Sequence, residues 1–316
     1  MANKHIESDE LLQTLMDLLK NYSPSIITRD GKPNGMEIAM RDHLVKILQN
    51  LGMTCDVSTG NLVATRGEVS KMNKAPMICA HMDTSIRNHL EDKNFSPLPC
   101  NTRLESLIKQ KIPVIEKFRP LGTKVRRYLD EALEDYTSPP DPHYFWCEDG
   151  YLGLDDKVGI AMALCIAKRT TYPLRLVFTY GEERGRLGIK KIKNTFYEGI
   201  SFAIVIDRHG SRDLVIEYPD NDENGEPVPL CSSEFGEQVR ELLGLTPVRE
   251  PKRCADAMNI RKISNDAINV VNVAMSIFGE HCAEDYMVIE DAHRILEKLV
   301  DLINNHASEL SNIPAA

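Results

Sequence analysis

Three short apolar segments of this chain are each followed by acidic or histidine residues. Segments of this length and composition are typical of strands buried in the centre of a sheet. The residues concerned are His81 and Asp83 after segment 76–80, Glu182 and Glu183 after segment 174–180, and Asp207 after segment 202–206. In open α/β sheets, functional groups gather beyond the carboxyl ends of such strands. The pattern therefore predicts that these polar side chains share one edge of an α/β sheet.

Segment 158–167 is apolar on nearly every face and follows two adjacent acids, Asp155 and Asp156. A helix this apolar is buried, so its N-terminus is expected inside the domain. Carboxylates carried there need a counter-charge, because burying an unpaired ion costs more than a marginally stable fold can absorb. Two interpretations remain open: one acid caps the helix while the other faces water, or both belong to a functional site.

Further elements surround this predicted core. Helical spacing of apolar residues and N-cap or C-cap signals predict helices near residues 10–19, 36–51, 233–243, 256–259 and 289–303. Strand patterns occur at residues 53–57, 62–65, 144–147, 214–218 and 267–273, the first two forming a hairpin. The mixture of elements indicates an α/β protein.

Residues 84–150 differ from the rest of the chain in their composition and in the pattern of their apolar residues. A polar stretch with Pro97 and Pro99 precedes two short helical patterns, near 104–108 and 125–133, and a proline-rich segment follows them. We interpret this region as an insertion within a single catalytic domain spanning 1–316. A lid, an oligomerisation arm and simple surface decoration remain alternatives for it.

Composition narrows the classes of partner. The 38 basic and 47 acidic residues give a net charge of -9, which argues against nucleic acid and anionic membranes as partners. No apolar stretch approaches the roughly 20 residues that a membrane span requires, and the N-terminus lacks a signal-peptide pattern, so a cytoplasmic location is expected. The eight cysteines are scattered singly, which favours reduced thiols over disulfides or a zinc-thiolate cluster.

The strand 267–273 runs towards a second histidine, and with it the candidate residues supply two imidazoles and three carboxylates. They are His81, Asp155, Glu183, Asp207 and His281. This inventory suits two divalent ions of zinc type, cobalt or manganese being alternatives, with one carboxylate shared between the ions. Two such ions about 3.5 to 4 Å apart would activate a water and polarise a carbonyl. Glu182 is the candidate proton shuttle, and Asp83 can orient His81 through a ring nitrogen. Taken singly, each motif also fits a satisfied core histidine or solvated surface acids.

The motifs, taken in order, resemble the co-catalytic zinc exopeptidase superfamily, which includes aminopeptidases, peptidase T-like tripeptidases and a carboxypeptidase and acylamino-acid deacylase branch. They lie at 81–83, 153–157, 182–185, 207 and 279–281, and segments 60–64 and 289–291 are similar as well. The resemblance implies a three-layer α/β/α fold with a mixed, mostly parallel central sheet, helices on both faces and an inserted segment.

Carried over by position, the resemblance assigns roles to individual residues. Asp155 would bridge the two metal ions. His81 and Asp207 would complete one ion, and Glu183 and His281 the other. Asp83 would orient His81, and Glu182 would be the general acid/base. The Asp155–Asp156 peptide bond is often cis in this family.

Two departures from the family pattern affect the expected activity. The deacylase branch usually inserts a lid domain between the equivalents of Asp207 and His281, and this chain has no room for one there, so it resembles the lid-less aminopeptidases. That branch also uses a lid histidine to bind the reaction oxyanion, so this chain needs another donor or relies on the metal ions. The insertion at 84–150 is longer than in the compact aminopeptidases.

We therefore expect a metal-dependent exopeptidase, an aminopeptidase acting on small peptides and capable of forming a homo-oligomer. A carboxypeptidase or N-acyl amino acid deacylase of the same chemistry is the first alternative. Acidic residues at 220–223 favour a positively charged amino terminus in the substrate, whereas Arg184, Arg186 and Arg208 favour a carboxylate. An inactive metal-binding scaffold is the second alternative, and the presence of Glu182 argues against it.

Overall fold

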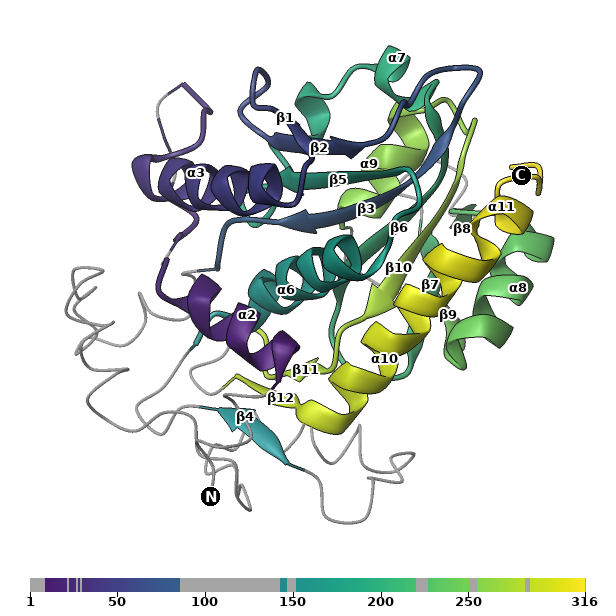
Figure 1. The fold of residues 1–316 in the computed structure, drawn as a ribbon. Coiled ribbons are helices and arrows are strands. Elements are labelled where there is room, and N and C mark those ends of the chain that lie inside the picture. Colours follow the sequence, from purple (N-terminus) through teal and green to yellow (C-terminus); the bar gives the residue numbers. More distant parts are fainter. Residues whose placement is uncertain are drawn as a thin grey trace.

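The computed structural model describes residues 9–21, 23–26, 28, 30–85, 143–146, 152–219, 227–249, 255–281 and 285–315. A nine-stranded mixed sheet forms the centre of this part of the chain (Figure 1). Its strands are β1 (Thr54–Asp56), β2 (Leu62–Arg66), β3 (Ala75–His81), β5 (Leu174–Thr179), β6 (Ile200–Arg208), β7 (Asp213–Pro219), β8 (Pro227–Pro229), β9 (Thr246–Arg249) and β10 (Asn269–Ala274).

The sheet has a parallel centre and antiparallel edges. The strands follow the order β1-β2-β5-β3-β6-β10-β7-β8, and β9 also pairs with β7. Strands β5, β3, β6 and β10 run parallel to one another, whereas β2 and β7 flank them in the antiparallel sense. The carboxyl ends of the four central strands therefore lie at the same edge of the sheet.

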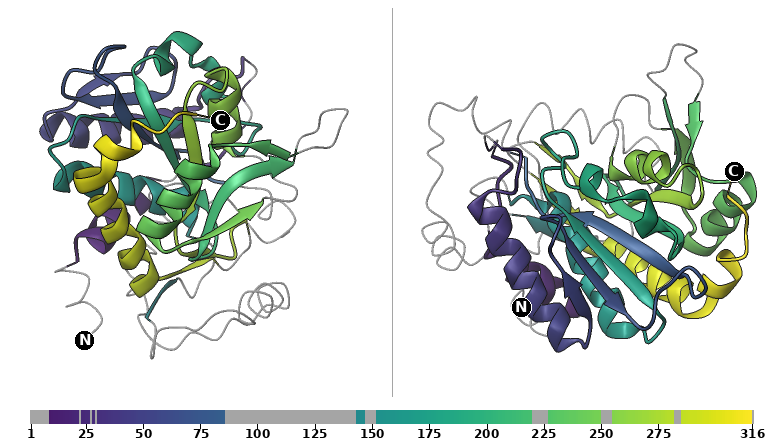
Figure 2. Two further views of the ribbon diagram at one scale, coloured as in Figure 1. Left: turned by 90° about the vertical axis from the view of Figure 1, so that its right-hand side faces the viewer. Right: turned by 90° about the horizontal axis from the view of Figure 1, so that it is seen from above.

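Helices cover both faces of this sheet. They are α2 (Glu10–Leu19), α3 (Gly35–Asn50), α6 (Leu154–Arg169), the 3-10 turn η1 (Ile189–Lys191), α7 (Asn194–Tyr197), α8 (Ser233–Leu243), α9 (Asp256–Ile263), α10 (Ile289–Asp301), the π-helical turn η2 (Leu302–His306) and α11 (Ala307–Leu310). Seen from above, the sheet runs between α3 and α10 on one side and α7 and α9 on the other (Figure 2).

Alternate residues of the central strands enter two separate apolar cores. On β3, Ile78 and Ala80 face the core beneath α6, whereas Met77 and Cys79 face the core beneath η1, α7 and α9. This period of two is the consequence of the pleat. The three-layer α/β/α arrangement that the motifs implied is thereby confirmed.

The apolar helix α6 lies against the centre of the sheet, and its residues Leu154–Ala167 are buried. Its N-terminus lies inside the domain, as its composition predicts: Asp155 is 6% exposed and Asp156 0%. Gly159 permits this close packing, because a Cβ there would meet an Asp156 oxygen at 2.2 Å and the Ile206 carbonyl oxygen at 2.3 Å. The helix thus carries two buried acids to the carboxyl edge of the sheet.

A second, three-stranded antiparallel sheet stands beside the first. Strand β12 (Tyr286–Val288) lies between β11 (Ile277–Phe278) and β4 (Tyr144–Trp146). The strand predicted at 144–147 therefore exists, but it joins residues close to His281 rather than the central sheet. The end of the insertion is tied to the C-terminal half of the chain in this way.

Most of the predicted elements are confirmed, but two candidate residues lie within strands rather than after them. His81 is the last residue of β3, and Asp207 is part of β6, which extends to Arg208. The helical patterns near 104–108 and 125–133, most of the insertion at 84–150 and the acidic loop at 220–223 lie outside the described residues. The single domain with its insertion stays a prediction. Within the described ranges, no helix combines the length and the apolar character needed to cross a membrane.

Candidate metal centre

The parallel strands bring the predicted acids and histidines together. His81 ends β3, and its neighbour in β5 is Thr179, from which the chain continues directly into the loop that carries Glu182 and Glu183. On the other side of β3, strand β6 places Asp207 so that its Oδ1 lies 3.6 Å from His81 Nε2. Three segments that are far apart in sequence therefore meet at one edge of the sheet, as the first pattern predicts.

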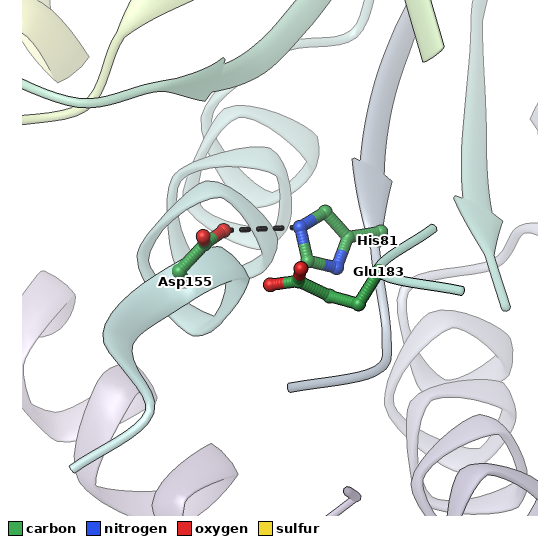
Figure 3. Close-up of side chains that lie close together, drawn as sticks. All are labelled: His81, Asp155 and Glu183. Carbon is green, nitrogen blue, oxygen red and sulfur yellow. Dashed lines mark hydrogen bonds and ion pairs between the residues drawn. The ribbon is translucent and has the colours of Figure 1, made fainter. Parts of the chain in front are cut away.

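Asp155 lies between the two candidate histidines. Its Oδ1 is 3.0 Å from His81 Nε2, and its Oδ2 is 3.1 Å from His281 Nε2. The side chains of Asp155 and Glu183 approach His81 from the start of α6 and from the loop after β5 (Figure 3). A carboxylate with one oxygen towards each imidazole has the geometry of a bridging ligand.

The candidate ligands divide into two groups around Asp155. Asp207 lies on the His81 side, whereas Glu183 lies on the His281 side, where its Oε1 is 2.6 Å from Nε2. Ligand atoms of His81, Asp155 and Glu183 lie within 4.8 Å of one another, and so do those of His81, Glu182 and Asp207. All five proposed ligands and the proposed base Glu182 are thus brought to one place.

His81 is oriented by the backbone of Asp83. The Nδ1 atom lies 2.9 Å from the Asp83 carbonyl oxygen but 3.6 Å from its carboxylate. A ring N–H donated to that carbonyl directs Nε2 at Asp155 and Asp207, and a bound metal ion would take the place of the Nε2 proton. The Asp83 carboxylate instead accepts the N–H groups of Glu182 and Glu183, at 2.9 and 3.2 Å.

Asp156 resolves the two interpretations of the acid pair. Its Oδ1 accepts the N–H of Gly159 at 3.1 Å, so Asp156 caps the first turn of α6, and its Oδ2 accepts the N–H of His81 at 2.9 Å. Asp155 faces the two histidines rather than water. The peptide bond between the two acids is cis, as the resemblance implied.

Acidic groups outnumber basic groups at this edge of the sheet. The buried or partly buried carboxylates are Asp83, Asp155, Asp156, Glu182, Glu183 and Asp207, and the basic groups among them are His81, His281 and Lys157. Burial raises the pKa of Glu182 well above its ordinary range, and the charge of Asp207 adds to this effect. Burial opposes ionisation of Asp155 as well, but hydrogen bonds from His281 and His81 outweigh it and lower that pKa. The donor atoms and the excess negative charge both suit divalent cations.

Several residues that complete the site gave no sequence signal of their role. Asp285 is 2% exposed, and its carboxylate accepts the N–H groups of Leu152, Gly153 and Leu154, at 2.6, 2.8 and 2.8 Å. It thereby fixes the turn that leads to Asp155. Its position four residues after His281 could have marked it for attention, but an acid in a loop is too common to be a signal by itself.

Lys157 and Asn272 fix the backbone segments that carry the candidate ligands. The buried Lys157 ammonium donates to the hydroxyls of Ser23 and Thr84, at 2.7 and 3.0 Å, and so ties α6 to the chain after β3. Asn272 Oδ1 accepts the N–H of Asp207 at 3.0 Å. The sequence pattern placed Asn272 correctly on a strand, but only the parallel pairing of β10 with β6 shows what it holds.

Asp256 is a further buried acid near the candidate ligands. It opens α9, is 2% exposed, and lies 2.5 Å from the Thr179 hydroxyl. Burial raises its pKa to about 7, although the hydrogen bond from Thr179 opposes the rise. The sequence placed Asp256 at the start of a predicted helix, and its proximity to the site follows only from the fold.

A small cavity of about 100 Å³ opens beside the candidate metal ligands. Its described lining combines acids and histidines with an apolar part, and comprises Asp155, Glu182, Asp207, Arg208, His209, Tyr218, Ala255, Asn272, Met275, Ile277, Glu280 and His281. Its acids are Asp155, Glu182, Asp207 and Glu280, and its basic groups are Arg208, His209 and His281. A small ligand can therefore reach the groups that would perform the chemistry.

Several solved structures with the same fold are peptidases. A tripeptidase from Staphylococcus aureus subsp. aureus Mu50 matches with a TM-score of 0.64 at 13% sequence identity, over 96% of this chain and 98% of that chain. For an aminopeptidase from the archaeon Desulfurococcus kamchatkensis the TM-score is 0.59 at 16% identity, over 96% of both chains. The TET1 peptidase of Pyrococcus horikoshii, which can assemble into a tetrahedron or a large octahedral shell, matches with a TM-score of 0.54 at 17% identity, over 92% of this chain and 99% of that chain.

No protein-family model matches the sequence, and no curated protein matches it. At identities this low, a structural match establishes a common architecture. The chain therefore has the fold of these solved peptidases, as the resemblance in its motifs implied.

Proposed function

We propose that this chain is a metal-dependent exopeptidase of the aminopeptidase type, which removes residues from the free amino terminus of small peptides. The observation that carries the proposal is the position of Asp155, whose two oxygens lie 3.0 and 3.1 Å from the Nε2 atoms of His81 and His281. The peptidase fold of the solved structures supports it.

The residues present fit two divalent ions. His81, Asp155 and Asp207 would hold one ion, and His281, Asp155 and Glu183 the other. Nitrogen and carboxylate donors in this ratio suit zinc, with cobalt or manganese as alternatives. When bound, such ions supply Lewis-acid activation of a water and of the scissile carbonyl.

Glu182 is the proposed general acid/base. It lines the cavity, and its carboxylate lies within 4.8 Å of ligand atoms of both His81 and Asp207. From there it can take a proton from the attacking water and deliver it to the leaving amine. Its N–H is held by Asp83 at 2.9 Å, which fixes the base relative to His81.

The charges around the cavity favour an amino terminus over a carboxylate as the recognised end of the substrate. Arg184 pairs with the buried Glu37 at 2.7 Å, and Arg208 pairs with Asp213 at 2.6 Å. Arg186 is not among the described lining residues of the cavity. Two of the three arginines that suggested a carboxylate are therefore engaged within the protein, and their charges are already balanced by Glu37 and Asp213.

A substrate panel with defined metal content tests this function. We expect peptides with a free amino terminus to be hydrolysed by protein that carries about two equivalents of zinc, cobalt or manganese, and the same peptides to resist hydrolysis once N-acetylated. Preferential cleavage of N-acyl amino acids would favour the deacylase alternative. Full hydrolysis by metal-free protein would contradict the mechanism.

We also propose that the chain forms a homo-oligomer, which the assembly of the Pyrococcus horikoshii TET1 peptidase supports. Light scattering on the full chain after size-exclusion chromatography tests this proposal. A mass equal to that of one chain across the working concentration range would contradict it.

A further inference from the structure

The loop that carries Glu182 and Glu183 is held by two buried acids from different parts of the chain. The N–H of Gly181 donates to Glu37 Oε1 at 2.9 Å, whereas the N–H groups of Glu182 and Glu183 donate to Asp83. Three successive backbone groups are thus fixed by side chains from α3 and from the end of β3. The position of the proposed base depends on both acids.

Glu37 is also bound by Arg184, which connects it to a further segment of the chain. The Arg184 Nη2 atom lies 2.7 Å from both carboxylate oxygens of Glu37, and its Nη1 donates to the carbonyl of Ile26. The side chains are 6% and 0% exposed, respectively. Glu37 also accepts the N–H of Asn34 at 2.6 Å, in the capping box of α3. The guanidinium therefore ties the loop both to α3 and to the segment before it.

Stability alone does not account for a buried ion pair at this place. Burying two charges costs about as much as their attraction returns, and apolar replacements of both partners are often neutral or stabilising. Glu37 and Arg184 meet at the loop that carries two proposed functional acids, and each of them also bonds to the backbone nearby. What the pair provides at this place is a fixed backbone position.

We propose that Arg184 and Glu37 are positioning residues, which hold Glu182 at the cavity and Glu183 beside His281 by fixing the backbone of residues 181–184. The proposal rests on the proposed peptidase function, and adds two residues that touch neither the substrate nor the metal ions. A planar guanidinium can bond to a carboxylate and a carbonyl in two fixed directions, which a lysine ammonium does not reproduce.

A double variant separates positioning from folding. Arg184→Met alone would leave the buried Glu37 without a counter-charge and is expected to lower the thermal midpoint. Glu37→Gln together with Arg184→Met removes both charges and should recover most of that midpoint. We expect this double variant to bind metal with wild-type stoichiometry, while kcat falls about 10- to 100-fold with little change in KM, the usual size of an effect on groups that orient a site.

Amide hydrogen exchange gives a readout that does not depend on activity. Exchange at Gly181 should be faster in the double variant than in the wild type, because the neutral amide that Glu37→Gln introduces is a weaker acceptor than the carboxylate and is no longer held by Arg184, whereas the N–H groups of Glu182 and Glu183 keep their acceptor Asp83. The milder Arg184→Lys should show an intermediate loss of kcat and serves as the test should the double variant fail to fold. Absence of peptidase activity in the wild type would contradict the proposed function. The exchange rate at Gly181 would still show whether Glu37 and Arg184 fix the backbone of this loop.

The pair Arg169 and Glu297 is the matched control. It joins α6 and α10 by two hydrogen bonds, at 2.7 and 2.5 Å, but is more exposed and belongs to a different surface. Arg169→Met with Glu297→Gln should leave both kcat and the exchange at 181–183 unchanged. Wild-type kcat in the Glu37 and Arg184 double variant, or unchanged exchange at Gly181, would overturn the proposal.

Discussion

One carboxylate organises the candidate site at the level of single residues. Asp155 reaches both imidazoles because it sits in the non-helical first turn of α6, with φ -82° and ψ 109°, whereas Asp156 turns back to cap the helix. Burial lowers the pKa of His281, but hydrogen bonds with Asp155 and Glu183 outweigh it and raise that pKa to about 11. In the absence of metal these histidines act as the counter-charge, and a bound cation would replace their protons.

The proposed base can be tested by a neutral replacement. Glu182→Gln keeps the shape of the side chain but cannot accept the proton from water, so kcat should fall by about two to four orders of magnitude. The metal content should stay at the wild-type level, which elemental analysis measures. Glu198→Gln, at an exposed position on the same half of the chain, is the control and should leave kcat unchanged. Wild-type turnover of Glu182→Gln would move the base to another residue.

At the level of elements, periodicity and end signals were enough to find the core. The apolar runs became β3, β5 and β6, and the apolar helix became α6, because a segment without a polar face has to be buried wherever it lies. Asp9, which caps α2, and Gly52, which has a positive φ after α3, could also be predicted, because a helix end is determined by neighbouring residues in the sequence. The meeting of His81 with Asp207 followed from the rule that parallel strands share a carboxyl edge.

Contacts between segments that are distant in sequence could not be predicted from the sequence. The small sheet of β4, β11 and β12 joins residues more than a hundred positions apart, and no local pattern distinguishes its strands from those of the large sheet. The same holds for Glu37 in the first turn of α3, which reaches Gly181 and Arg184 only because α3 packs beside the loop. Asp83 was assigned to His81 through its carboxylate, whereas the backbone carbonyl lies closer.

A substitution of Asp285 tests whether its carboxylate stabilises the turn before α6. Asp285→Ala would leave three buried N–H groups without their charged acceptor, and we expect the free energy of unfolding to fall by about 3 kcal/mol. Metal affinity should fall too, because Asp155 follows this turn directly. Asp42→Ala, which removes an exposed acid from α3, should change stability by less than about 0.5 kcal/mol in the same denaturant titration. Equal stability of the two variants would contradict this role of Asp285.

At the level of the whole molecule, the N-terminal helix is fastened to the C-terminal helix by Asp9 and His293, whose Oδ2 and Nε2 lie 2.6 Å apart. Burial opposes ionisation of Asp9, but the hydrogen bond with His293 outweighs it and lowers the pKa of Asp9. The hydrogen bond with Asp9 raises the pKa of His293, although burial opposes the rise. Both shifts favour the charged pair in the folded state.

The pH dependence of this fastening follows from the signs of the two shifts. The contribution of Asp9 is present above its ordinary pKa of 3.8 and is lost as the pH falls through its lowered value. The contribution of His293 is complete below its ordinary pKa of 6.5 and is lost as the pH rises through its raised value. The pair should therefore stabilise the fold most between about pH 4 and 6.5.

His293→Gln measures that contribution. Because the pair is partly exposed, we expect a loss of about 0.5 to 1 kcal/mol near pH 5, which shrinks as the pH rises above the folded pKa of His293. Urea titrations of both proteins at several pH values would show this. The partly exposed pair of Asp17 in α2 and His43 in α3, altered by His43→Gln, offers a comparison. A loss for His293→Gln that grows with pH would contradict the assignment.

The central claim is that Asp155 shares its carboxylate between two cations. Anomalous diffraction at the zinc edge, from crystals of protein purified with zinc, tests it most directly. We predict two peaks about 3.5 to 4 Å apart, with Asp155 between them, His81 and Asp207 at one peak, and His281 and Glu183 at the other. A single peak, or peaks remote from the Asp155 carboxylate, would contradict the claim.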